Sequence, residues 1–280
     1  MAQGELARRD ARPRPTRRTA VVVAGSLAGP LAKWARADAK LQRLRAEVNA
    51  AWPPHQLWPV RTETDRTGLK FRFYLGELPD IQPDWALEAG EILFNLRSAL
   101  DHLAYELAVR RFRGRIPSKI EGTTQFPIYD SAGAWKQGHR RIQHLAIRDR
   151  RALKQFQPFI TRTDRWEWHR FWLSRLNAWH NIDKHRRLHL VTGAKNSSVI
   201  MDPRPRSFVG ADFIYGPMKS HSHVETWTFS EPPEEMRPHP GVFLHVALEH
   251  GGEYDRLCDV ALYATAARVR EVLDRFADRF

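Results

Sequence analysis

The stretch NLRSALDHLAYEL, residues 95–107, decides the fold that we expect for this chain. Its leucines recur at three- and four-residue spacing, which predicts an amphipathic helix that packs its apolar face on a core. The same segment carries four polar side chains: Asn95, Arg97, Asp101 and His102. On a helix with ~100° per residue, Asn95 and His102 share one flank of the leucine face. Arg97 and Asp101 stack on the opposite flank, at the four-residue spacing of an intrahelical ion pair.

The sequence around this helix predicts an α+β fold. A first helix is expected from about Pro30 to Ala51, where two prolines end it, and the helix of the quoted stretch runs from Pro83 to near Phe112. Between them, residues 58–78 predict a β-hairpin that turns at 65–68 and buries alternate side chains of its second arm.

Further helices are expected over residues 140–159 and from about Asp164 to Leu190. The tryptophans of the second one are expected in the core. Short strands follow, with the sequences HLVTG, SSVIMD, DFIYG, VETWTFS and GVFLHVALEH. We therefore expect a disordered basic tail over residues 1–28 and one α+β domain over 29–280. That domain divides into a central helical bundle (about 30–190) with the flanking hairpin, an antiparallel β region (about 190–255) and a closing amphipathic helix (256–280).

Composition narrows the class of protein. The 280 residues are 42% hydrophobic and 28% charged, as in globular proteins. No apolar run reaches the ~18–20 residues that cross a bilayer, so we expect no membrane partner. Cys258 is the only cysteine, which excludes an intrachain disulfide and indicates a cytoplasmic protein. Paired arginines before an apolar run near the N-terminus resemble an export signal, but the run continues into the first helix, which favours a tail.

The charge balance suggests the kind of partner. Lys and Arg number 45 against 32 Asp and Glu, a net charge of +13. This excess favours RNA, DNA or an acidic protein as partner, through phosphate contacts and counterion release. The alternative is an arginine-rich codon usage, because the arginines are spread along the chain. Neither a P-loop nor a Gly-x-Gly-x-x-Gly motif supports nucleotide hydrolysis or dinucleotide chemistry.

A second polar segment, NAWHNIDKHRRLH at residues 177–189, carries Asn177, Asp183, Lys184, His185 and Arg186. Asp183 or Asn177 would fix the tautomer of His102, while the cations would meet a phosphate. Alternatively, these groups bond to buried backbone and hold one helix against another. His185 and His189 have a spacing that suits a metal, but this helix offers no third histidine on the same face, so we expect no metal and no cofactor.

Several motifs together resemble a widespread uncharacterised bacterial family: RADAKLQRL, NLRSALDHLA, QFPIY, QFQPF and NIDKHR, within residues 30–190. Arg97 and His102 also match the Arg–four residues–His signature of the HEPN superfamily. Its members are helical bundles and often metal-independent ribonucleases. The chain departs from that pattern at Ser98, where those enzymes commonly have Asn, Asp or His.

The HEPN resemblance implies roles for two residues. His102 would act as general acid or base on the ribose, and Arg97 would stabilise the charge of the phosphorane. One straight helix separates their side chains by ~140°, so this hypothesis requires an adjacent helix or a homodimer. The sequence thus predicts a HEPN-like protein that binds RNA, with metal-independent cleavage left open. The alternative is a non-catalytic module for a polyanionic partner, in which both polar segments are structural.

Overall fold

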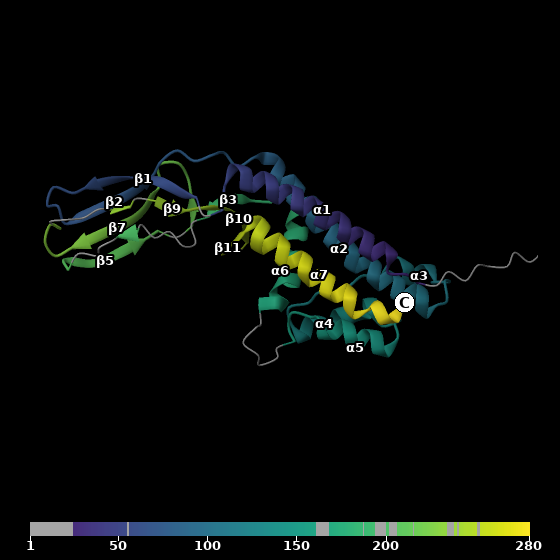
Figure 1. Ribbon diagram of the computed structural model, residues 1–280. Coiled ribbons are helices and arrows are strands. Elements are labelled where there is room, and N and C mark those ends of the chain that lie inside the picture. Colours follow the sequence, from purple (N-terminus) through teal and green to yellow (C-terminus); the bar gives the residue numbers. More distant parts are fainter. Residues whose placement is uncertain are drawn as a thin grey trace, which may run out of the picture.

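The chain has the expected α+β fold (Figure 1). The computed structural model describes residues 25–54, 56–160, 168–186, 188–193, 200–201, 206–214, 216–233, 238–239, 241–250 and 253–280.

Helix α2 (Pro83–Arg111) is the centre of the helical part. It packs against α1 (Ala28–Ala51), α6 (Trp168–His185) and α7 (Tyr263–Arg275). Its leucine face is completely buried, as the spacing predicted. Pro83 lies in the first turn, where its missing N–H costs nothing, and two arginines in the last turn complement the helix dipole. Shorter helices complete this part: α3 (Ser118–Glu121), α4 (Ala132–Gly138) and α5 (Ile147–Gln155).

Within the described residues, all strand pairs are antiparallel. A five-stranded sheet has the order β5-β7-β2-β1-β9, and Figure 1 places it at one end of the helical part. Its strands are β1 (Leu57–Thr64), β2 (Lys70–Leu75), β5 (Phe208–Phe213), β7 (His223–Phe229) and β9 (Gly241–Phe243). A second sheet has the order β11-β10-β3-β6, from β3 (Leu190–Gly193), β6 (Pro217–Met218), β10 (His245–His250) and β11 (Glu253–Arg256). Strand β4 (Ile200–Met201) pairs with β8 (Pro238–His239).

The predicted hairpin is confirmed as β1 and β2, with Gly68 at φ +70° in its turn. Phe73 and Leu75 are buried, while Lys70 and Arg72 are exposed, as the alternation predicted. The hairpin flanks the helical part and forms one sheet with β5, β7 and β9 of the C-terminal β region. Strand β1 pairs with β9 and strand β2 pairs with β7, so the backbone hydrogen-bonding groups at both edges of the hairpin have partners.

Several boundaries differ from the prediction. The helix expected over 140–159 is a 3₁₀ turn (His139–Ile142) followed by α5, because Ala146 between them has an extended backbone (ψ 144°). The strand expected at DFIYG lies earlier, as β5. The region expected to form the closing helix, residues 256–280, starts with the last residue of β11 and a π-helical turn (Leu257–Leu262). Helix α7 therefore starts only at Tyr263.

Another difference concerns the N-terminal tail. Leu27 is buried, and the N–H of Ser26 donates to Oε2 of Glu106 at 2.9 Å. Residues 25–28 therefore belong to the folded part rather than to the tail. The rest of the expected tail, residues 1–24, lies outside the described residues, as do residues 161–167 of the helix expected from Asp164.

Candidate functional site

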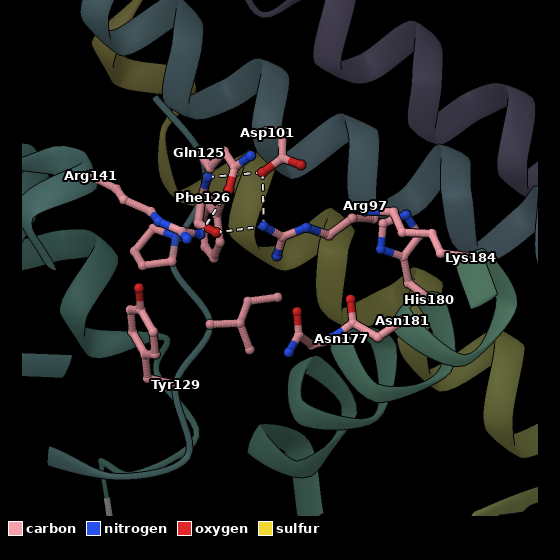
Figure 2. Close-up of a pocket in the computed structure, with 12 residues that line it drawn as sticks. Arg97, Asp101, Gln125, Phe126, Tyr129, Arg141, Asn177, His180, Asn181 and Lys184 are labelled. Atoms are coloured by element: carbon pink, nitrogen blue, oxygen red, sulfur yellow. Dashed lines mark hydrogen bonds and ion pairs between the residues drawn. The ribbon is translucent and has the colours of Figure 1, made fainter. Parts of the chain in front are cut away.

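A pocket opens between α2, α6 and the segment 125–129, with a volume of about 350 Å³ (Figure 2). Three apolar residues of the segment form part of its wall, and the other lining residues are polar or charged. The lining residues are Arg97, Asp101, Gln125, Phe126, Pro127, Ile128, Tyr129, Arg141, Asn177, His180, Asn181 and Lys184.

The guanidinium of Arg97 is fixed at one wall of this pocket. Its Nη2 donates to Oδ1 of Asp101 at 2.9 Å and to the carbonyl oxygen of Phe126 at 2.7 Å. The same Asp101 oxygen accepts the N–H of Phe126 at 2.9 Å. Arg97, Asp101 and the backbone of Phe126 thus form a closed ring of hydrogen bonds. Arg97 is only 8% exposed, and its Nη1 has no hydrogen-bond partner among the described residues. Burial lowers the pKa of Arg97, and Asp101 opposes this shift.

The segment 126–129 is held in place from behind by Gln157, which is completely buried. Its Nε2 donates to the carbonyl oxygens of Pro127 (2.9 Å) and Leu153 (3.1 Å), and its Oε1 accepts the N–H of Tyr129 at 3.1 Å. A Cβ at Gly138 would lie 1.9 Å from the Tyr129 hydroxyl oxygen, so a larger residue there would displace the Tyr129 side chain. The backbone of the pocket wall is thus rigidly positioned.

Helix α6 lines the opposite side with Asn177, His180, Asn181 and Lys184, whose spacing places them on one helix face. His180 is buried and contacts Phe94, with ring centroids 6.1 Å apart. Burial, together with the charges of Lys184 and Arg97, lowers the pKa of His180 to about 4. Its imidazole is therefore neutral at pH 7.

The pocket is electropositive. Its lining includes the cations Arg97, Arg141 and Lys184 but a single carboxylate, Asp101, and that carboxylate is already paired with Arg97. Arg141 reaches the pocket from the side opposite to Arg97 and donates from Nη1 to Oε1 of Gln125 at 2.8 Å (Figure 2). Convergent cations of this kind bind phosphate or carboxylate oxygens.

Four of the residues predicted from the sequence line this pocket: Arg97, Asp101, Asn177 and Lys184. His102 does not. It is exposed on the other flank of α2, where its Nδ1 would lie 3.7 Å from a Cβ at Gly29 of α1. Within one subunit, Arg97 and His102 therefore do not share a cleft, because α6 covers only the Arg97 flank.

The other predicted residues lie elsewhere. Asn95 is buried and donates to the carbonyl oxygen of Glu91 within its own helix. Asp183 packs on α2 at Gly90, where an added Cβ would lie 2.4 Å from its Oδ1, and burial raises its pKa. Gly90 and His102 are twelve residues apart, ~18 Å along a helix axis. Asp183 thus cannot fix the tautomer of His102 in the same subunit.

His185 and Arg186 are exposed and do not line the pocket. His189 pairs with Glu249. Across the part of the chain that the structure describes, no three His, Cys, Asp or Glu side chains gather as metal ligands. Trp172 and Trp179 are buried, which confirms their predicted place in the core.

His180 and Asn181 were not predicted as site residues, although both lie on the helix face that Asn177 and Lys184 define. Gln125, Tyr129 and Arg141 were not predicted either. Gln125 and Tyr129 are the two ends of the QFPIY motif, whereas no local signal marks Arg141, which reaches the pocket from the 3₁₀ turn His139–Ile142.

Comparisons of the chain with family models, with curated proteins and with solved structures found no match. Among the helices that the structure describes, none is both long and apolar enough to cross a bilayer.

Proposed function

We propose that the protein binds RNA by holding a backbone phosphate between Arg97, Arg141 and Lys184. One observation carries this proposal: Arg97 is buried and fixed by Asp101 and Phe126, yet its Nη1 has no partner among the described residues. A buried donor without an acceptor costs ~1–3 kcal/mol, and more for a charged group. A phosphate that enters the pocket would accept a charge-assisted hydrogen bond from the Arg97 guanidinium.

Other groups support RNA as the ligand. The net charge of +13 attracts a polyanion to the whole molecule. The neutral polar side chains of Asn177, Asn181 and Tyr129 line the same pocket. They combine donors and acceptors, which suits ribose hydroxyls and base edges. The cytoplasm, where RNA is available, is the compartment that the single cysteine indicates.

Binding is tested with labelled single-stranded RNA, by fluorescence anisotropy at fixed salt in the presence of EDTA. The double variant Arg141→Gln/Lys184→Gln removes two exposed pocket cations and leaves the buried Arg97 ion pair intact. We expect its Kd to rise at least about tenfold, and the slope of log K against log salt to fall by about one per lost phosphate contact.

The matched control is Arg151→Gln/Arg186→Gln, which removes the same charge from exposed positions outside the pocket. Its Kd should change less than about threefold. Equal losses in both double variants, or absence of RNA binding by the wild type, would contradict the proposal.

A second candidate function, metal-independent RNA cleavage, is favoured by His180. Its neutral imidazole lies in the same pocket as Arg97. It would take the proton of a 2′-hydroxyl whose oxygen attacks the adjacent phosphorus, and Arg97 would stabilise the phosphorane. The P–O5′ bond would then break, and the imidazolium would return the proton to the leaving 5′-oxygen. RNA incubated in EDTA should then be cut by the wild type and by His102→Ala but not by His180→Asn. Loss of cleavage in His102→Ala would instead support the homodimer predicted from the sequence, which light scattering measures directly.

A further inference from the structure

A second basic pocket adjoins the first. It has a volume of about 400 Å³ and is lined by Gly122, Thr123, Gln125, Arg140 and Arg141. Gln125 and Arg141 belong to both pockets, so their hydrogen-bonded side chains form a common wall. No carboxylate lines the second pocket.

Two consecutive arginines supply its charge. Arg140 and Arg141 follow each other in the 3₁₀ turn His139–Ile142. The Arg140 side chain is exposed and makes no ion pair or hydrogen bond with the described residues. Arg141 uses Nη1 for Gln125, and a guanidinium has five N–H donors, so it retains donors for anions on either side. The shared arginine thus lies between two positions that can each take a phosphate.

An aromatic side chain accompanies this pair of pockets. The Tyr129 ring lines the first pocket and packs edge-on against Trp135, with centroids 6.3 Å apart and an interplanar angle of 79°. An aromatic ring beside a phosphate site suits the stacking of an unpaired base. The bases of a duplex are stacked on each other and do not present their faces in this way.

We infer that the ligand is a single-stranded oligonucleotide with successive phosphates in the two pockets and Arg141 between them. This inference rests on the proposed function and adds the strandedness of the bound chain and the place of a second phosphate. A mononucleotide would fill the first pocket only, so affinity should depend on the number of linked phosphates.

The test compares 5′-uridine monophosphate with hexauridylate by isothermal titration calorimetry, using the full chain. For the wild type we expect hexauridylate to bind at least about tenfold more tightly than the monophosphate. Arg140→Gln should reduce this ratio to about twofold or less, whereas the exposed control Arg151→Gln should keep it. A duplex of six base pairs should bind more weakly than the single strand of six nucleotides.

The outcomes separate the two proposals. The inference fails if both ligands bind the wild type with similar affinity. It also fails if Arg140→Gln and Arg151→Gln have the same ratio of hexauridylate affinity to monophosphate affinity, because the second pocket is then not a phosphate site. In that case, weaker monophosphate binding by Arg141→Gln/Lys184→Gln would still support the proposed function. If neither ligand binds the wild type, both proposals fail.

Discussion

Gln157 and Tyr129 are joined by a hydrogen bond of 3.1 Å, in which the backbone N–H of Tyr129 donates to Oε1 of the buried glutamine. This bond links the QFQPF motif to the QFPIY motif. Arg97 and Asp101 of NLRSALDHLA hold Phe126 of the same loop, and Lys184 of NIDKHR lies across the pocket. Four of the sequence segments quoted above therefore line one cavity or hold its wall.

Gln157→Leu should lower the free energy of unfolding by about 2–3 kcal/mol. The leucine leaves the N–H of Tyr129 and the carbonyl of Pro127 without their buried partner. Urea unfolding followed by fluorescence measures the loss. Gln143→Leu, at an exposed position, should change the value by less than about 0.5 kcal/mol. Similar values for the two variants would show that Gln157 does not hold the loop.

Asp101→Ala should destabilise the fold by about 2 kcal/mol, because the buried Arg97 loses its counter-charge and the N–H of Phe126 loses its acceptor. The expected loss is smaller than for a fully buried pair, since the Asp101 side chain is 32% exposed. Asp101→Asn keeps an acceptor oxygen and should lose about half as much. Chemical denaturation compares both with Asp278→Ala, an exposed carboxylate, and equal effects of all three would refute the role of the ion pair.

Gly90→Ala should destabilise the protein by about 1–3 kcal/mol, although alanine is the better helix former. The new Cβ would lie 2.4 Å from Oδ1 of Asp183 and would push α6 away from α2. In an Asp183→Ala background the same change should cost little, because the contact is gone. A double-mutant cycle of unfolding free energies therefore predicts a coupling of at least about 1 kcal/mol between the two positions. If the effects of the two substitutions on the free energy of unfolding simply add, the close approach of Gly90 and Asp183 is contradicted.

The stability of the wild type should increase with pH between about 4 and 6.5 on account of His180. Its pKa is lowered to about 4 in the folded protein, while an unfolded histidine keeps a pKa near 6.5. Between these values the unfolded chain binds the additional proton, so acidification favours unfolding by up to roughly 3 kcal/mol. His180→Gln should remove this contribution. The measurement is the difference in unfolding free energy between wild type and variant across this pH range, and a pH-independent difference would be inconsistent with a buried neutral imidazole.

Local patterns were sufficient for the helix around residues 95–107 and for the hairpin, because burial in each follows a period of 3.6 or 2 residues. The same kind of pattern predicts one helix over residues 140–159, although the backbone of Ala146 is extended. Its apolar spacing continues across the break: Ile142 and Leu145 before it, and Leu153 after it, are all buried. Periodicity alone does not reveal such an interruption.

For the site, composition and spacing identified the charged side chains, including Arg97 and Lys184, but not their neighbours. A helical wheel places Arg97 and His102 on different flanks of α2, and the packing of α6 against one flank makes Arg97 a pocket residue and leaves His102 exposed. Arg141 comes to the same pocket as Arg97 only through the fold of residues 112–141. Such long-range neighbours depend on how helices and loops pack together, and that packing is set by the burial of the whole core rather than by any short segment.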